Sequence, residues 1–361
     1  MPPVTAHELA QARQVSSLSE KRLHLGPRLQ SLPLATLYLT ERCNSRCVTC
    51  DYWRHGRVDM NLESVARLLP SLARLRTKVV LISGGEPLLN LEWADIAQLL
   101  RTNGLKLWLL TSGLSLVKHA RRAADLFNAI TVSLDGTNRE TYAAIRGLDA
   151  FDNVCAGIRA AAATDVPVSV RVTVQRANYR QLPAFIALAR EMRVQQISFL
   201  AVDVANPHAF GRVDDFGPDL ALHAEDLPVF EQILCGMERE FAGDFRSGFI
   251  AESPSKLWHT HQYFSALCGA GAYPPVRCNA PEFSAVIGVE GRINPCFFIP
   301  GPADALARDD LEKALNADAM IALRQNIRAG TRPECARCVC SLWREPGSRA
   351  SDFLLPHKQY A

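Results

Sequence analysis

Three cysteines near the first apolar segment have a spacing that could hold a metal cluster. Cys43, Cys47 and Cys50 form a C-x3-C-x2-C pattern. Iron–sulfur cubanes are held by cysteine thiolates, usually four of them. Three thiolates would leave one iron open for another ligand, just as a catalytic zinc ion keeps an open position. A zinc ion is the alternative, with His55 as its fourth ligand.

A second group of cysteines lies toward the C-terminus. Its spacing is C-x12-G-x4-C followed by C-x2-C, formed by Cys278, Cys296, Cys335 and Cys338. Segments 282–289 and 292–294 predict a β-hairpin, which would bring the first two of these cysteines to one end. Four thiolates suit a closed iron–sulfur or zinc site. Cys268 and Cys340 remain, either as replacement ligands, as residues lining the site, or as inert thiols.

The bulk sequence favours metal ligands over disulfides. The N-terminal residues contain no apolar core of a secretory signal. We therefore expect a cytoplasmic protein, and disulfides are rare in that compartment. A net charge of +3 predicts no nucleic-acid partner. A membrane partner is not expected either, because the sequence contains no run of about eighteen apolar residues.

The elements that must position these cysteines follow a β–α rhythm from residue 34 to about residue 205. Short apolar runs rich in β-branched residues alternate with amphipathic helical stretches. The expected strands are 34–40, 78–83, 105–111, 129–134, 167–175 and 195–202. Six successive units predict a parallel sheet with helices outside, either a partial barrel or a doubly wound sheet. A polar loop is expected at 203–224 and a helix at about 225–243.

Short segments at the ends of these strands resemble motifs of the radical S-adenosylmethionine (SAM) superfamily. In chain order they are the C-x3-C-x2-C segment, Ser83-Gly-Gly-Glu-Pro87, Thr111-Ser-Gly113, Val132-Ser-Leu-Asp-Gly136, Tyr142-x3-Arg146-Gly147 and Arg171-Val-Thr-Val-Gln175. The five motifs that follow the cysteine segment, in this order, identify the chain as a member of the superfamily. One position departs from it, because Thr49 stands where many members carry an aromatic residue. Tyr52 and Trp53 are the expected replacements.

The resemblance implies an α/β fold built as a partial (β/α)6 barrel of the TIM type. It implies a [4Fe–4S] cluster on Cys43, Cys47 and Cys50, with the amine and carboxylate of SAM on the open iron. Reductive cleavage of SAM then gives methionine and a 5′-deoxyadenosyl radical, which abstracts a hydrogen atom from the substrate. Glu86 is expected to bind the amino group of SAM. The full expected SAM site is Tyr52, Trp53, Gly84, Gly85, Glu86, Pro87, Ser112, Ser133, Arg146 and Arg171.

The second cysteine group, over residues 268–341, resembles the auxiliary-cluster domain of SPASM-type radical SAM enzymes. The full SPASM pattern carries further cysteines and binds two clusters, whereas this chain stops at C-x2-C-x-C. It therefore resembles the shortened "twitch" version. The resemblance implies one auxiliary [4Fe–4S] cluster held by Cys278, Cys296, Cys335 and Cys338, with structural zinc as the alternative. Molybdopterin-pathway members end in Gly-Gly, unlike Tyr360-Ala361 here.

The resemblance predicts an enzyme of the oxidoreductase or lyase type that uses two [4Fe–4S] clusters and SAM. The expected substrate is a small natural-product intermediate such as a sugar, aminocyclitol or nucleoside, which is oxidised or decarboxylated. A peptide- or protein-modifying maturase is the alternative, although only 33 residues precede the first strand, too few for a leader-binding domain. A non-catalytic iron–sulfur redox sensor is the alternative of another class. Asp135 and His208 are the expected catalytic residues.

The predicted organisation follows from these assignments. It comprises an N-terminal extension (1–33), a radical SAM core (34–205), a connecting loop and helix (206–267), an auxiliary-cluster domain (268–345) and a C-terminal tail (346–361). The expected partners are the small-molecule substrate and an electron donor such as flavodoxin or ferredoxin.

Overall fold

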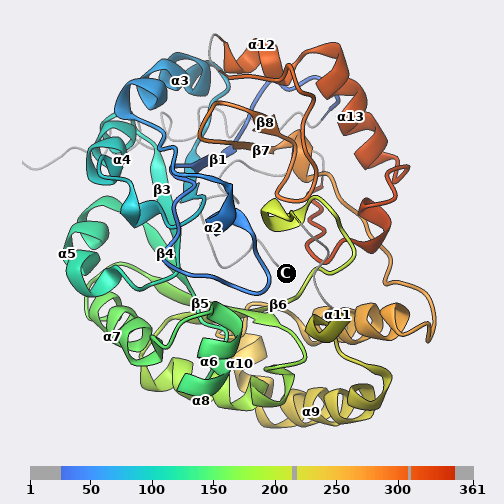
Figure 1. Ribbon diagram of the computed structural model, residues 1–361. Coiled ribbons are helices and arrows are strands. Elements are labelled where there is room, and N and C mark those ends of the chain that lie inside the picture. Colours follow the sequence, from blue (N-terminus) through green and yellow to red (C-terminus); the bar gives the residue numbers. More distant parts are fainter. Residues whose placement is uncertain (1–25, 214–217, 308–309, 346–361) are drawn as a thin grey trace, which may run out of the picture.

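A computed structural model describes residues 26–213, 218–307 and 310–345. Within these ranges the strands form one sheet in the order β6-β5-β4-β3-β2-β1-β7-β8. The strands are β1 (Leu34–Tyr38), β2 (Val79–Ser83), β3 (Lys106–Thr111), β4 (Ala129–Ser133), β5 (Val168–Val174), β6 (Gln196–Ala201), β7 (Ser284–Ile287) and β8 (Ile293–Asn294). Figure 1 shows this sheet curving around the centre of the molecule with helices along its outer side.

The first six strands and the helices between them form the predicted β–α units. The helices are α2 (Tyr52–His55), α3 (Leu62–Arg74), α4 (Trp93–Thr102), α5 (Leu116–Leu126), α6 (Arg139–Arg146), α7 (Phe151–Ala162) and α8 (Leu182–Glu191), followed by α9 (Leu227–Glu240), α10 (Ala242–Ser247), α11 (Pro254–Leu267), α12 (Leu311–Leu315) and α13 (Asp318–Arg328). All six predicted strands are confirmed, and their ends differ from the prediction by at most two residues.

The chain order of the strands decides between the two predicted architectures. β1 to β6 pair in sequence and in parallel, without the reversal of strand order that defines a doubly wound sheet. The two outer strands, β6 and β8, do not pair with each other among the described residues. The sheet is therefore an open, partial barrel.

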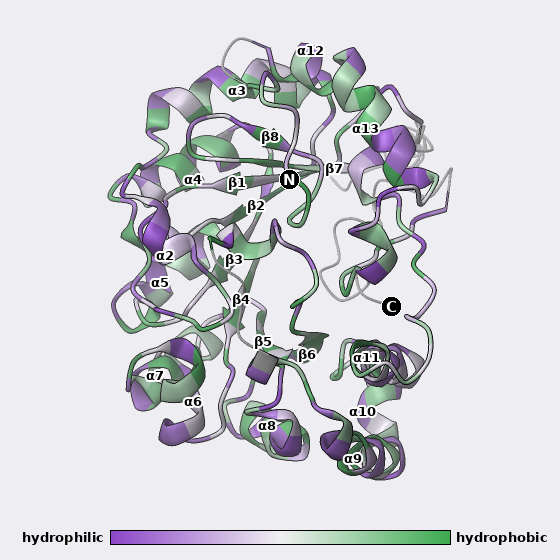
Figure 2. Ribbon diagram, turned by 45° about the vertical axis from the view of Figure 1, so that its right-hand side comes forward, coloured by the Kyte–Doolittle hydropathy of each residue, from purple (hydrophilic) through white to green (hydrophobic). Residues whose placement is uncertain are grey.

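Burial on both faces explains why these apolar segments form strands. Leu37, Ile130 and Val170 are fully buried within the sheet, as expected for parallel strands covered by helices. The helices between them carry one apolar face, and Figure 2 shows both hydropathy colours along them. Local caps set their first residues, since the Asn61 side chain accepts a hydrogen bond from the Ser64 amide at 2.9 Å.

Two later segments extend the sheet at its edges. β7 pairs in parallel with β1, and β8 returns antiparallel to β7, which confirms the predicted hairpin. At the other edge, the backbone around Ile250 pairs in parallel with Ile197 of β6. The segment that carries the second cysteine group thus contributes two strands to the barrel sheet.

The predicted helix at about 225–243 corresponds to α9. The predicted loop at 203–224 contains short 3-10 turns at Ala209–Gly211 and Pro218–Leu220. None of the described helices is both long and apolar enough to span a bilayer. The predicted tail, residues 346–361, and most of the predicted N-terminal extension lie outside the described residues.

Candidate active site

The loop that carries Cys43, Cys47 and Cys50 packs against the turn after β2. The amide of Gly85 donates to the Thr40 carbonyl and the amide of Glu86 donates to the Arg42 carbonyl, both at 2.8 Å. A Cβ atom on Gly85 would lie 2.3 Å from the Arg42 carbonyl oxygen, and Gly84 has a φ of +118°. The two glycines are therefore required by the close approach of this loop.

The same loop packs on its other side against the end of α6. The amide of Arg46 donates to the carbonyl of Arg146, and the amide of Val48 donates to the carbonyl of Ile145, both at 3.0 Å. α6 ends at Gly147 in the left-handed conformation, with a φ of 72°. A Cβ atom there would lie 2.3 Å from the Arg46 carbonyl oxygen. Arg146 and Gly147 thus end the helix and allow the cysteine loop to pack closely against it.

The three thiols of the loop lie close enough for Cys47 to act electrostatically on Cys43 and Cys50, and their environment is poorly hydrated. Burial raises the pKa of Cys43 to about 11 and that of Cys50 to about 12, and the neighbouring Cys47 raises both further. The Arg146 guanidinium opposes this effect at all three thiols. It forms a buried ion pair with Asp135 at 3.0 Å. Metal binding would have to displace thiol protons, and a fixed cation favours the thiolate form.

The residues present fit an anionic thiolate cluster with a bound polar ligand. The donor set is three thiols beside one buried guanidinium, and two polar atoms of the same segment are buried without a hydrogen-bond partner. These atoms are Ser45 Oγ and Trp53 Nε1. Buried polar groups normally have partners, so such atoms suggest a ligand. Among the described residues, no three His, Cys, Asp or Glu side chains converge closely enough for a single metal ion.

Glu86 is fully buried and held in one orientation. One carboxylate oxygen accepts a hydrogen bond from the Thr111 hydroxyl and the other accepts one from the Ser112 amide, each at 2.7 Å. The Ser112 hydroxyl in turn donates to Asn44 of the cysteine loop at 3.1 Å. The turns after β2 and β3 are thereby tied to the loop. The binding of SAM by Glu86 and Ser112 stays a prediction.

The two expected catalytic residues lie in different surroundings. Asp135 is 1% exposed, and its two oxygens accept hydrogen bonds from Arg146 and from the Thr173 amide. His208 is exposed on the loop after β6, and its charge acts on Glu334. The surroundings of Asp135 are those of a residue that orients a cation. A catalytic role for either residue stays a prediction.

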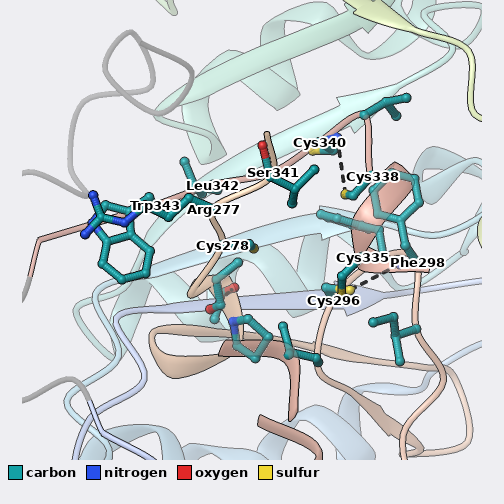
Figure 3. A pocket seen from close by; sticks show the side chains of 18 of the residues that line it. Arg277, Cys278, Cys296, Phe298, Cys335, Cys338, Cys340, Ser341, Leu342 and Trp343 are labelled. Atoms are coloured by element: carbon teal, nitrogen blue, oxygen red, sulfur yellow. Dashed lines mark hydrogen bonds between the residues drawn. The ribbon is translucent and has the colours of Figure 1, made fainter. Parts of the chain in front are cut away.

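The second cysteine group lines a cavity of about 370 Å³ (Figure 3). The four expected ligands are joined there by Cys340, so that the wall carries Cys278, Cys296, Cys335, Cys338 and Cys340. Two sulfurs accept backbone hydrogen bonds at 3.4 Å, from the amides of Phe298 and Cys340. Burial raises the pKa of Cys335 to about 11 and that of Cys296 to about 12. The hairpin cysteines and the C-x2-C pair thus line one cavity, and their binding of a common cluster stays a prediction.

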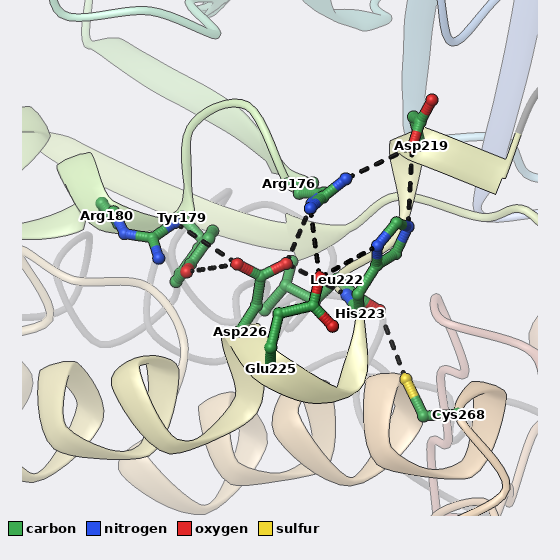
Figure 4. A network of polar contacts seen from close by, with 9 residues as sticks. All are labelled: Arg176, Tyr179, Arg180, Asp219, Leu222, His223, Glu225, Asp226 and Cys268. Atoms are coloured by element: carbon green, nitrogen blue, oxygen red, sulfur yellow. Dashed lines mark hydrogen bonds and ion pairs between the residues drawn. The ribbon is translucent and has the colours of Figure 1, made fainter.

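Cys268, the other unassigned cysteine, lies in a different environment. Its thiol donates to the Leu222 carbonyl at 3.4 Å, beside a network of charged groups shown in Figure 4. At the centre of that network, Asp226 accepts hydrogen bonds from Arg176 at 3.0 Å and from the Tyr179 hydroxyl at 2.7 Å. These contacts fix the start of α9 against the end of β5. Cys268 therefore belongs to this network and does not line the cysteine cavity.

Tyr38 links the two cysteine groups and was not identified from the sequence. It is the last residue of β1, and its ring lies 5.5 Å from that of Tyr52 and 6.5 Å from that of Phe297. Tyr52 follows Cys50 by two residues, and Phe297 follows Cys296 directly. The available signal was its position at the end of the first strand, where parallel barrels place their active sites.

Glu252 forms a buried acidic group in the same cavity. It is 1% exposed and accepts hydrogen bonds at 2.8 Å from the Ser198 hydroxyl and from the Phe199 amide. Burial raises its pKa to about 7, although these two donors and the charge of Arg171 lower it. Arg171 pairs in register with Ser133 on β4, and its charge also acts on Cys340. Arg171, expected at SAM, therefore lies near the second cysteine group.

Comparison with known proteins agrees with this geometry. Residues 37–189 match the model of the radical SAM superfamily. Fe-coproporphyrin III synthase of Methanosarcina barkeri is 29% identical over 174 residues, which are 46% of this chain and 43% of the relative. GTP 3′,8-cyclase of Klebsiella pneumoniae is 32% identical over 170 residues, or 44% of this chain and 52% of the relative. The chain thus spans about half the length of these curated relatives.

Solved structures share the fold over most of the chain. SuiB of Streptococcus suis, bound to S-adenosylmethionine, superposes with a TM-score of 0.62 at 14% identity, covering 98% of this chain and 81% of SuiB. The protein anSMEcpe, with bound AdoMet and the Cp18Cys peptide, superposes with a TM-score of 0.59 at 17% identity, covering 85% and 88%. At these identities the likeness is one of fold.

Replacing Gly85 by Ala tests the close packing of the cysteine loop. The new methyl group would overlap the Arg42 carbonyl, which we expect to displace the loop and to destabilise the protein by about 1–3 kcal/mol. Iron bound after anaerobic reconstitution should fall severalfold. Gly243→Ala is the matched control, because a Cβ atom there meets no atom within 4 Å. Equal iron content in the two variants would contradict the packing argument.

The raised pKa of Glu252 predicts a pH-dependent stability. The carboxyl group has a pKa of 4.5 as its reference value and about 7 when folded. The unfolded chain therefore loses this proton first, and the native protein loses stability as the pH rises from about 4.5 to about 7. The full shift is worth about 3 kcal/mol. Urea unfolding should show Glu252→Gln gaining stability relative to wild type across this window, whereas parallel pH profiles would refute the assignment.

Proposed function

The chain contains a radical SAM domain at residues 37–189, and from this premise we propose that it abstracts a hydrogen atom from a small natural-product intermediate. Sugars, aminocyclitols and nucleosides are the substrates in view, with oxidation or decarboxylation as the net reaction. The same proposal places the enzyme in the cytoplasm, where thiols stay reduced, with a flavodoxin or ferredoxin as electron donor.

The cavity beside the second cysteine group is the observation that carries this proposal. Its volume of about 370 Å³ lies in the range of pockets for small ligands, about 300–1,000 Å³. Thr36 of β1 and Leu200 of β6 line it, so it opens into the interior of the barrel. The names of the sequence relatives, a GTP cyclase and a coproporphyrin synthase, also point to small molecules.

The chain's own residues supply binding and orientation at the first cysteine group. When bound at Cys43, Cys47 and Cys50, a [4Fe–4S] cluster with SAM supplies a 5′-deoxyadenosyl radical for hydrogen abstraction. Glu86, held by Thr111 and Ser112, offers a fixed negative charge for the amino group of SAM. Arg146 balances thiolate charge and is itself held by Asp135.

The expected SAM-binding set is proposed with the roles that its positions suggest. Trp53 offers an aromatic surface and an indole N–H without a partner, and Tyr52 contacts Tyr38 beside the cavity. Pro87 begins the 3-10 turn that orients Glu86. Ser133 ends β4 at the same edge of the sheet.

At the second group, we propose that Cys278, Cys296, Cys335 and Cys338 hold an auxiliary [4Fe–4S] cluster. That cluster would accept the second electron when a substrate radical is oxidised. Glu252 faces the same cavity with a pKa of about 7, so its carboxylate can take up the proton that such an oxidation releases.

Cleavage of SAM distinguishes an enzyme from an iron–sulfur sensor. Anaerobically reconstituted protein with dithionite should release 5′-deoxyadenosine from SAM, and the Cys43→Ala, Cys47→Ala, Cys50→Ala triple variant should release none. Cys235→Ala is the control, because that thiol is exposed on α9. Wild-type protein that leaves SAM intact would overturn the enzymatic proposal in favour of a sensor.

Iron counting tests the auxiliary cluster. Two cubanes give about eight irons per chain, and Cys335→Ala with Cys338→Ala should reduce this to about four. That double variant should still cleave SAM but should lose the oxidised product. About four irons and one zinc in wild type would replace the auxiliary cluster with structural zinc.

A further inference from the structure

Lys256 lies in the first turn of α11 and faces the cavity of the second cysteine group. It borders this cavity of about 370 Å³ together with Cys338 and Cys340. It also borders a smaller adjoining cavity in which Cys338 is again a neighbour. Burial raises the pKa of the Cys340 thiol, whereas the charge of Arg171 and, to a smaller extent, that of Lys256 lower it. The ammonium group is therefore close to the thiols but is not one of the metal-binding groups.

The other charged residues around this cavity already have partners. Glu252 is held by Ser198 and Phe199, and the charge of Arg171 acts on it. Glu334 pairs with Arg332 at 2.8 Å. The Lys256 ammonium, in contrast, forms no ion pair with any residue that the structure describes. Its positive charge is thus not neutralised by an acidic residue and can act on the cysteines that line the cavity.

Arg277, the remaining cation of the cavity lining, is also engaged. Its guanidinium lies 3.7 Å from the centroid of the Trp343 ring and pairs with Glu345 at 3.5 Å. Figure 3 shows Arg277 beside Trp343, on the far side of Cys278 from Cys338 and Cys340. Arg171 acts more strongly than Lys256 on Cys340, but its charge also acts on Glu252 and it does not line the cavity. Lys256 is therefore the lining cation at the Cys338–Cys340 end whose charge is not shared with a carboxylate.

We propose that Lys256 raises the reduction potential of the auxiliary cluster by placing an uncompensated positive charge beside Cys338 and Cys340. Four thiolates make such a cluster anionic, and reduction adds one further negative charge. A nearby cation stabilises the reduced form more than the oxidised form, and net charge around a cluster is one of the factors that set its potential. Lys256 acts through the cluster's surroundings and is a positioning residue.

The inference rests on the proposed auxiliary cluster. It implies that electrons pass from the substrate radical to this cluster. A higher potential makes the cluster a better acceptor for the electron that an oxidised substrate radical must lose. Removing the positive charge of Lys256 from the cavity wall should lower the ratio of reduced to oxidised cluster about tenfold at a fixed potential. For a one-electron couple this corresponds to about 59 mV.

The test is a dithionite redox titration of the reconstituted full-length protein, followed by EPR. The variants are Lys256→Gln, Lys256→Arg and Lys313→Gln, the last being an exposed lysine on α12 outside the cavity lining. The Cys43→Ala, Cys47→Ala, Cys50→Ala background isolates the auxiliary signal. We expect a lower potential in Lys256→Gln, and wild-type potentials in Lys256→Arg and Lys313→Gln.

Three outcomes would contradict the proposed role of Lys256. Equal potentials in Lys256→Gln and wild type, with about eight irons in the unmutated chain, would overturn the role of Lys256 and leave the auxiliary cluster intact. An equal fall in Lys313→Gln would assign the effect to overall charge and would likewise overturn it. About four irons in the unmutated chain would overturn the auxiliary cluster and this inference together.

Discussion

The docking of one loop against two neighbouring backbones is the constraint on which the rest of the site depends. The loop after β1 must present three half-buried cysteines, and its own amides and carbonyls must still find partners. It finds them in the turn after β2 on one side and in the end of α6 on the other. Both contacts require glycine, because Gly85 and Gly147 meet loop carbonyls where any Cβ atom would overlap them. The glycines of these motifs are thus required for the packing of the loop, whether or not a ligand is bound.

The second constraint is the addition of β7 to the edge of β1. This pairing is parallel and places Ser284 opposite Leu34, so a segment from late in the chain becomes part of the barrel sheet. It carries Cys278 and Cys296 to the side of the strand whose loop carries the first thiols. Tyr38 then contacts aromatic neighbours of both cysteine groups. One strand, β1, therefore connects the two cysteine groups through its pairing with β7 and through Tyr38 at its end.

Local patterns allowed the six strands, the hairpin and both cysteine groups to be predicted, because each depends on residues near one another in sequence. The pairing of β7 with β1 joins segments about 250 residues apart, and no local pattern encodes it. The same limit concealed Lys256 and Tyr38, whose importance comes from what the fold brings beside them. Arg171 shows the converse, since a motif position predicted for SAM also faces Glu252 and Cys340.

The two cysteine groups differ in the cation that lies beside each of them, and this difference affects the chemistry that each group can support. Beside the first group, Arg146 is buried and fixed by Asp135, so its charge is partly compensated and cannot move away. Beside the second group, Lys256 is partly exposed on a flexible side chain and has no described ion-pair partner. A fixed ion pair favours a constant geometry, as the positioning of a bound ligand requires. An uncompensated charge beside a cluster chiefly changes its potential, which suits a site that exchanges electrons.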